Sequence, residues 1–162
     1  MPFPSNRKFL FATRVHPKRG LVTMNQETWT WTKEYTFPSD MGTAHSLIEE
    51  VMDKVRADQW NDKDLFAIEL VLEEILTNAV KHGNQSDPSK IVRFDGKLNR
   101  DKLCIRIEDE GDGFDPHSVV DPREPANQMS ASGRGILLVK HFATRVKWSE
   151  RGNVIEFEKN RS

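Results

Sequence analysis

Three short segments in a fixed order constrain this chain more than any other feature of its sequence. They span residues 74–78, 109–113 and 133–135. The first places Glu74 and Asn78 four residues apart in an amphipathic pattern, so both side chains would project from the same face of a helix. The other two supply an aspartate and closely spaced glycines, where exposed backbone amides can meet phosphates. Together the segments predict one site for a magnesium-bound nucleotide.

Length and charge limit the classes of protein that remain. A chain of 162 residues is long enough for one buried core and short for two, so we expect a single domain. The 24 basic and 25 acidic side chains leave a net charge of −1, which gives no global field to attract nucleic acid or an anionic membrane. The lone Cys104 lies in an apolar alternation, so we interpret it as a buried strand residue, and a reducing cytoplasm fits.

The first 25 residues differ from the rest of the chain. Their charged residues are all basic, namely Arg7, Lys8, Arg14, Lys18 and Arg19. Three interpretations stay open: a disordered arm, an extension upstream of a true start at Met24, and an arm that binds a partner. We expect residues 26–160 to form the single folded domain that contains all three segments. No apolar run approaches the roughly 18 to 20 residues of a membrane span, and the N-terminus lacks a clear signal-peptide core.

Hydrophobic periodicity predicts a strand followed by two amphipathic helices. Residues 27–37 alternate aromatic and polar side chains, which is typical of a strand. Apolar residues then repeat at three and four positions across about 40–59 and again across 62–82. Asn61 or Asp62 would cap the second helix and Gly83 would end it. This second helix carries the first of the three segments.

The second half of the chain predicts two hairpins and a short helix. Residues 91–98 and 102–108 alternate about a polar turn, and a second hairpin closes the chain after residue 145. Residues 111–132 lack a sustained period and are long for a connection, which suggests a lid, while 136–142 predict a helix. The order of elements implies an α+β two-layer sandwich, with one mixed, mostly antiparallel sheet and helices on one face.

The three segments and this element order resemble the GHKL, or Bergerat-fold, ATPases, and among them the anti-sigma-factor serine/threonine kinases, also called switch kinases. The resemblance spans about residues 26–159. It implies the histidine-kinase-like ATPase fold and a site for ATP and Mg²⁺.

Glu74 and Asn78 match the N box of that family, in which the amide oxygen ligates Mg²⁺ and the carboxylate acts as general base. The assignment agrees with elementary chemistry, because Mg²⁺ prefers oxygen ligands and usually keeps waters. A base one helical turn away can also reach a hydroxyl beside the γ-phosphate. A solvated helix face is the alternative interpretation of such a pair. Glu73 is the poorer candidate for the base because it points about 100° away around the helix.

Asp109, Gly111 and Gly113 match the G1 box, where the resemblance implies that the aspartate accepts a hydrogen bond from the adenine amine. An ionised carboxylate accepts and does not donate, so it would favour adenine over guanine. The glycines would let the backbone approach the nucleotide. Taken alone, the segment is equally typical of a turn. Asp112 and Asp115 lack the full spacing of a calcium loop.

Gly133 and Gly135 match the G2 box, where the first amides of a helix would face the phosphates. Arg134 either offers positive charge to the triphosphate or points to solvent, and Arg123 in the lid is a weaker candidate of the same kind. We interpret His82 as a residue at a helix C-terminus rather than a phosphorylated histidine, and a place at the edge of the nucleotide stays open for it.

The resemblance implies an ATP-dependent serine/threonine protein kinase that acts as an anti-sigma factor or partner-switching regulator. Its substrate would be a small anti-anti-sigma, STAS-like protein, its other partner a sigma factor or another regulator, and the family's dimers imply a homodimer. No direct contact with nucleic acid or a membrane is expected. Two alternatives stay open: a nucleotide-gated binding module without phosphotransfer, and a stand-alone histidine-kinase-like ATPase domain, for which 162 residues leave no room for a phosphoacceptor helix pair.

Overall fold

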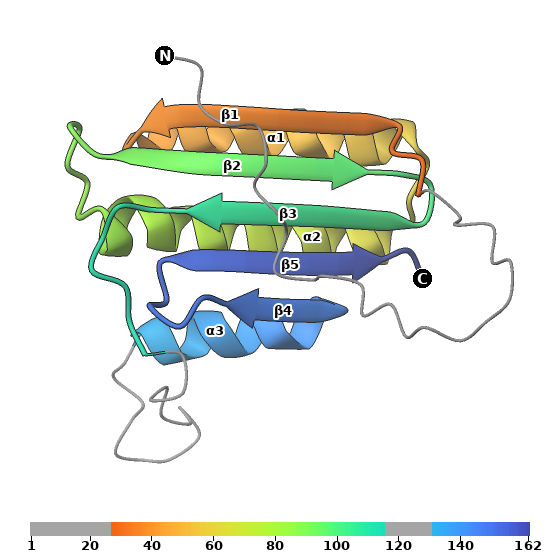
Figure 1. Ribbon diagram of the computed structural model, residues 1–162. Coiled ribbons are helices and arrows are strands. Elements are labelled where there is room, and N and C mark those ends of the chain that lie inside the picture. The colour runs from red at the N-terminus through yellow and green to blue at the C-terminus, as the bar shows by residue number, and fades with distance from the viewer. Residues whose placement is uncertain (1–26, 116–130) are drawn as a thin grey trace, which may run out of the picture.

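The computed structural model describes residues 27–115 and 131–162, which form a five-stranded sheet with helices packed on one face (Figure 1). The elements in chain order are β1 (Trp31–Pro38), α1 (Met41–Ala57), α2 (Asp62–Thr77), η1 (Asn78–Gly83), β2 (Ile91–Leu98), β3 (Lys102–Glu108), α3 (Ala131–Phe142), β4 (Arg145–Trp148) and β5 (Val154–Asn160). This arrangement confirms the predicted α+β fold. The basic segment 1–25 and most of the expected lid lie outside the described residues.

The strands follow the order β1-β2-β3-β5-β4, and every neighbouring pair in the described part of the sheet is antiparallel. No parallel pair occurs among these strands, although a mixed sheet was expected. The β2–β3 hairpin has the predicted bounds. Its turn is closed by Oδ1 of Asn99, which accepts the N–H groups of Asp101 and Lys102, each over 2.9 Å. The last strand, β5, lies between β3 and β4, which places the end of β3 beside the β4–β5 turn.

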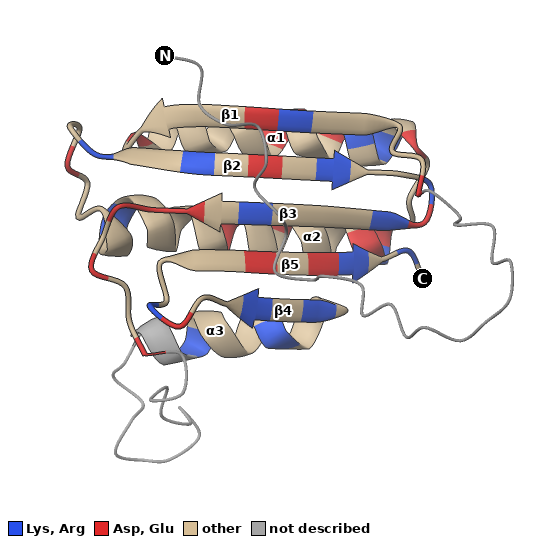
Figure 2. Ribbon diagram, in the orientation of Figure 1, with Lys and Arg blue, Asp and Glu red and all other residues tan. Residues whose placement is uncertain are grey.

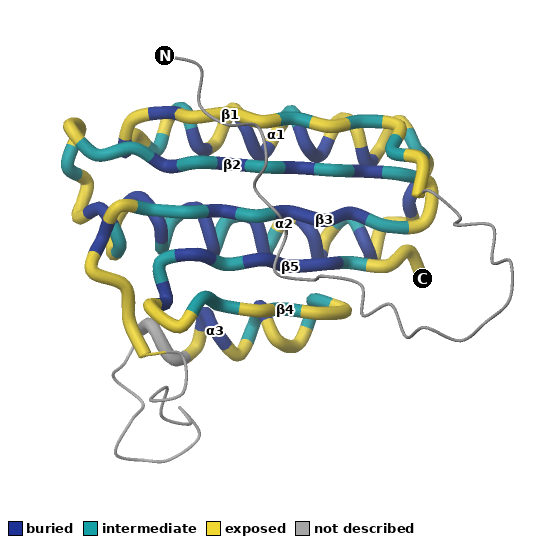
Figure 3. The backbone as a smooth tube through the Cα atoms, viewed as in Figure 1, coloured by how far each residue is buried: buried dark blue, intermediate teal, exposed yellow. Residues whose placement is uncertain are grey.

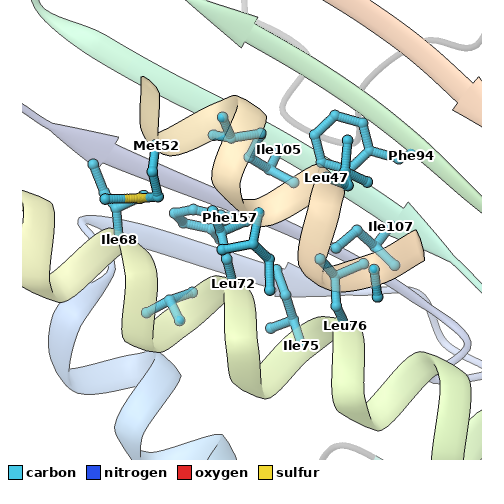
Figure 4. Close-up of a cluster of buried hydrophobic side chains, with 14 of the residues drawn as sticks. Leu47, Met52, Ile68, Leu72, Ile75, Leu76, Phe94, Ile105, Ile107 and Phe157 are labelled. Atoms are coloured by element: carbon cyan, nitrogen blue, oxygen red, sulfur yellow. The ribbon is translucent and has the colours of Figure 1, made fainter. Parts of the chain in front are cut away.

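One hydrophobic core fills the space between the sheet and helices α1 and α2 (Figure 4). The helices contribute the apolar positions that repeat at three and four residues, and β2 contributes every second residue. Leu72 and Leu76 from α2 and Phe94, Ile105 and Phe157 from the sheet are among the fully buried side chains. Burial of each contributes roughly 1.5–3 kcal/mol, so this layer contact fixes the position of α2 over the sheet.

Acidic and basic residues recur along the strands of the sheet (Figure 2). The guanidinium of Arg106 on β3 lies close to three carboxylates. Its Nη2 atom is 2.9 Å from Oε2 of Glu108, and its Nη1 atom is 3.5 Å from Oδ2 of Asp95 on β2. Its Nε atom is 3.5 Å from Oε1 of Glu156 on β5. Buried and partly buried positions alternate along β2, as expected for a strand with one face toward the core (Figure 3). In the two described ranges, no helix has both the length and the apolar character needed to cross a membrane.

Helix α2 differs from the prediction in its last turn. An α-helix was expected to about residue 82, but after Thr77 the chain continues as the π-helical turn η1. The N–H group of Asn84 bonds the carbonyl oxygen of Ala79 over 2.9 Å, a span of five residues. The apolar repeat continues through Ala79 and Val80, so the local pattern contains no sign of the wider turn. Such turns are rare and occur frequently at functional sites.

Candidate functional site

Glu74 and Asn78 lie one turn apart where α2 passes into η1. Nδ2 of Asn78 donates a hydrogen bond to Oε1 of Glu74 over 2.9 Å. This bond orients the amide, and Oδ1 of Asn78 is then the oxygen that can face a cation. It engages only one oxygen of the carboxylate, so the second oxygen of Glu74 can accept a proton. The first segment therefore places an amide oxygen that can ligate a cation beside a carboxylate that can accept a proton.

Gly135 on α3 brings the third segment against this pair. A Cβ atom built on Gly135 would lie 1.6 Å from Oε1 of Glu74, so glycine leaves room for the carboxylate in its present position. Gly133 precedes it in α3, and Arg134 is exposed. Helix α3 begins at Ala131, earlier than the expected start near residue 136, because glycines are weak helix formers and conceal the beginning of the helix in the sequence.

Asp109 lies at the other end of η1. A Cβ atom built on Gly83 would lie 2.4 to 2.6 Å from the carboxyl atoms of Asp109. One built on Gly111 would lie 2.1 Å from the carbonyl oxygen of Gly83. The carboxylate and the loop after β3 therefore rest directly on the backbone at the end of η1. Gly83 was expected only to end a helix, and the structure adds this close approach as a second reason for glycine.

The environment of Asp109 disfavours its ionised form. Burial raises the pKa of Asp109 above its ordinary value. The N–H group of Gly111, which donates to Oδ1 over 2.8 Å, acts in the opposite direction, and the nearby Glu108 adds to the rise. The net result is a raised pKa. Carboxyl groups with perturbed pKa values cluster at functional sites, and an acceptor with few protein donors is suited to a ligand that brings its own.

The loop after β3 also packs against the β4–β5 turn. Gly113 has a φ of +78°, and a Cβ atom on it would lie 1.8 Å from the carbonyl oxygen of Arg151. Gly152 has the same φ, and its Cβ would lie 1.9 Å from the carbonyl oxygen of Phe114. Both positions therefore require glycine. The glycines of the second segment thus approach neighbouring backbone, and their contact with a nucleotide stays a prediction.

Two predicted residues are not joined to the others. His82 is exposed on η1, and in the described part of the chain no hydrogen bond or ion pair links it to the three segments. Arg123 lies outside the described residues. The roles of both toward a nucleotide stay predictions.

Three contributors to the site were missed or only partly understood from the sequence: Gly83, Asn84 and Asn153. Nδ2 of Asn153 donates to the carbonyl oxygen of Asp109 over 3.1 Å, and the N–H group of Asp109 donates back to the carbonyl oxygen of Asn153 over 3.0 Å. Asn84 is fully buried. Glycine and asparagine are common in turns, so nothing in a single sequence separates these residues from ordinary turn residues.

The three segments therefore form two connected halves, one at each end of η1. Glu74, Asn78 and Gly135 form the half with an amide oxygen, a carboxylate and helix backbone. Asp109 and Gly83 belong to the half with a partly buried acceptor. This set of groups fits a magnesium-bound adenine nucleotide, because hard oxygen ligands suit Mg²⁺ and a carboxylate suits the adenine amine.

Comparison with known protein families agrees with this geometry. Residues 37–159 match the histidine kinase-like ATPase domain, and the chain belongs to that family. The matched range contains all three segments. It confirms the resemblance to the GHKL ATPases and the fold that the resemblance implied.

Curated relatives are similar over a shorter region. The chain is 30% identical to the anti-sigma F factor of Clostridium perfringens strain 13 over 84 residues, which cover 49% of this chain and 59% of that protein. It is 28% identical to the anti-sigma F factor of Halalkalibacterium halodurans over 88 residues, or 52% and 59% of the two chains. It is 28% identical to the serine-protein kinase RsbW of Bacillus licheniformis over 90 residues, or 52% and 56%. The chain thus spans less than two thirds of the length of these relatives.

Proposed function

We propose that this protein is an ATP-dependent serine/threonine protein kinase that regulates transcription by switching between protein partners. The observation that carries the proposal is the contact of Glu74 with Asn78 and Gly135, which sets a carboxylate beside an amide and the backbone of α3. The names of the relatives, anti-sigma F factor and serine-protein kinase, support the choice of this class within the family.

In this proposal, Mg²⁺-bound ATP supplies the γ-phosphoryl group. Asn78 offers Oδ1 as a metal ligand. Glu74 takes the proton of a serine or threonine hydroxyl while the hydroxyl oxygen bonds to phosphorus and the bond to the departing ADP breaks. Asp109 accepts a hydrogen bond from the adenine amine, and the backbone of Gly133 and Gly135, with Arg134, binds the phosphates.

The proposed partners follow from the relatives. The phosphate acceptor is a hydroxyl on a small anti-anti-sigma, STAS-like domain, and the protein that is held and released is a sigma factor or another regulator in the cytoplasm. A homodimer is part of the proposal. The nucleotide controls which partner is held, which requires contacts that differ between the ATP and ADP states, because a ligand shifts only the equilibria that it distinguishes.

The substitution Glu74→Gln tests the chemistry. We expect phosphotransfer to a captured partner to fall by about 10²- to 10⁴-fold, the range for loss of a general base. Binding of Mg²⁺-ATP, measured by calorimetry, should change by less than about threefold. Glu73→Gln is the matched control, because Oε2 of Glu73 lies 3.6 Å from Nε2 of His45 on α1 and so belongs to another surface.

To identify the partner, proteins that bind this chain are captured from native lysate with and without ATP. The captured proteins are then assayed for phosphoserine and phosphothreonine. A wild-type chain that does not bind Mg²⁺-ATP would contradict the proposal as a whole. Binding without transfer to any captured partner would favour the nucleotide-gated binding module. Unchanged transfer by the Glu74→Gln variant would remove Glu74 as the base.

A further inference from the structure

Asn84, the residue directly after η1, is a fully buried polar side chain at the junction of four segments. Its Nδ2 group donates to Oγ of Ser39 over 2.8 Å and to the carbonyl oxygen of Ile91 over 2.9 Å. Its Oδ1 atom accepts the N–H group of Glu110 over 2.7 Å. One side chain therefore ties the end of η1 to the end of β1, the start of β2 and the loop after β3.

The backbone of Asn84 takes part in the same junction. Its N–H group bonds the carbonyl oxygen of Ala79 and so closes the π-helical turn. Gly83, the preceding residue, is the surface on which the Asp109 carboxylate rests. Gly83 and Asn84 therefore act on the loop after β3 from two sides, one by contact and one by a hydrogen bond.

The bond to Glu110 has a direct consequence for Asp109. Glu110 is the next residue, so its N–H group belongs to the peptide that Asp109 begins, and holding that group limits the rotation of the peptide. The N–H group of Gly111 bonds Oδ1 of Asp109, which fixes the carboxylate relative to the same loop. Asn84 thus orients, through the loop backbone, the carboxylate of Asp109, whose second oxygen is Oδ2.

We propose that Asn84 is a positioning residue for nucleobase recognition: it holds the loop after β3 so that the Asp109 carboxylate meets the 6-amino group of adenine. This inference deepens the proposed function and rests on it. Asn84 itself touches no nucleotide in this proposal. Its loss should weaken the discrimination between bases, while the groups near Glu74 and Asn78 continue to bind the triphosphate.

The experiment compares the affinities of the full chain for Mg²⁺-ATP and Mg²⁺-inosine triphosphate, which carries an oxygen in place of the 6-amino group. The wild type should prefer ATP, and Asn84→Ala should reduce that preference by about tenfold, the effect of one well-placed hydrogen bond. In an Asp109→Ala background, Asn84→Ala should lower ATP affinity by less than about twofold further, because residues that act through one another are not additive.

Asn61→Ala is the matched control. Asn61 also accepts a backbone N–H group, that of Asp64, over 2.9 Å, but it lies at the other end of α2. This variant should be less stable and should keep the wild-type ratio of the two affinities. If Asn84→Ala does not fold, Asn84→Ser, which keeps a hydroxyl in the buried position, enters the same comparison.

The outcomes separate this inference from the proposed function. A wild type that binds ATP in preference to inosine triphosphate, with a ratio that the Asn84 variants leave unchanged, overturns the inference alone. An equal loss of ATP affinity with and without Asp109 also overturns it, because that result describes a general loss of structure. A wild type that binds neither nucleotide overturns the proposed function, and this inference falls with it.

Discussion

Asp64 lies in the first turn of helix α2, and Asp109 lies beside the end of its extension η1. Burial acts on both carboxyl groups. Asp64 accepts hydrogen bonds from the N–H group of Ser162 over 2.8 Å and from Nδ2 of Asn61 over 3.0 Å, and its Oδ1 lies 3.0 Å from Nζ of Lys159. Asp109 accepts one backbone bond within its own loop, from Gly111. A fully buried carboxylate near the start of α2 thus has several donors from the fold, whereas a partly buried carboxylate beside the end of η1 has a backbone donor in its own loop.

The pKa values follow from this difference. Burial raises the pKa of Asp64, but the bonds from Ser162 and Lys159 outweigh it, so the net pKa lies below its ordinary value. Burial also raises the pKa of Asp109, and the single backbone bond from Gly111 is too little to reverse it. Donors supplied by the fold make Asp64 a stabilising residue. At Asp109 the donor would come from the adenine amine, which is the part of the proposed function that this comparison tests.

The largest expected effect is at Asp64. Replacing it with Asn leaves Lys159 without its buried partner, which should lower the free energy of unfolding by about 3–5 kcal/mol, as measured by urea denaturation. ATP affinity should not change. Asp62→Asn is the control, since Asp62 is exposed in the same first turn, and its effect should stay below about 1 kcal/mol. Equal stability of the Asp64 variant and the wild type would remove the distinction between the two ends.

Asp109→Asn should make the nucleotide-free chain more stable, whereas Asp64→Asn should make it less stable. Because ionisation of Asp109 is disfavoured in the fold, the neutral amide should raise the midpoint of thermal unfolding without nucleotide. Loss of a hydrogen bond to a charged acceptor should weaken ATP binding by about 1.5–3 kcal/mol, or about tenfold to 150-fold. Thermal unfolding with and without Mg²⁺-ATP measures both effects. A lower midpoint without nucleotide would show that Asp109 is structural, like Asp64.

Gly83→Ala tests the contact that holds Asp109. The new methyl group would enter the space of the carboxylate, and the resulting shift should weaken ATP binding by about 1–3 kcal/mol, the usual range for overpacking. Gly42→Ala in α1 is the control, because its Cβ would lie 3.2 Å from Oδ2 of Asp40, a contact that this exposed side chain can relieve. Calorimetric titration with ATP compares the two. Similar affinities for both variants would contradict a tight contact at Gly83.

The smallest expected effect is a difference in the pH at which Asp64 and Asp109 change the free energy of unfolding. The ionised form of Asp64 stabilises the fold above its unfolded pKa of about 3.9, and this contribution is lost as the pH falls through the lower folded pKa. The ionised form of Asp109 destabilises the free chain at neutral pH, and this cost disappears as the pH falls through its raised pKa.

Urea unfolding from pH 7 to pH 3 measures this difference for the wild type and for the Asp64→Asn and Asp109→Asn variants. The difference in the free energy of unfolding between the wild type and the Asp109 variant should close as the pH falls through the raised pKa of Asp109, before the difference for the Asp64 variant begins to close. The gap for the Asp64 variant should close only below about pH 3.9. Closure of both gaps at one pH would contradict the assignment of opposite shifts.

The sequence predicted much of the scaffold, and the site residues that it proposed stay predictions. The β2–β3 hairpin follows from alternation on both sides of a turn that Asn99 closes, and both signals lie within a few residues of each other. The cap of α2 is Asn61, one of the two candidates. The change from α-helix to π-helical turn was not predicted, because Ala79 and Val80 continue the apolar repeat and the wider turn depends on how Asn84 is held from outside the helix.

Sequence alone therefore determined the amphipathic faces of α1 and α2, the hairpins and the three segments of the site, since periodicity and turn chemistry act over short stretches of chain. Only the tertiary structure decided that Gly135 contacts Glu74, that Gly83 packs against Asp109 and that Asn84 hydrogen-bonds across four segments. These contacts join residues far apart in the chain, and they form when the helices pack on the sheet. A glycine or an asparagine in such a contact looks the same in sequence as one in an ordinary turn.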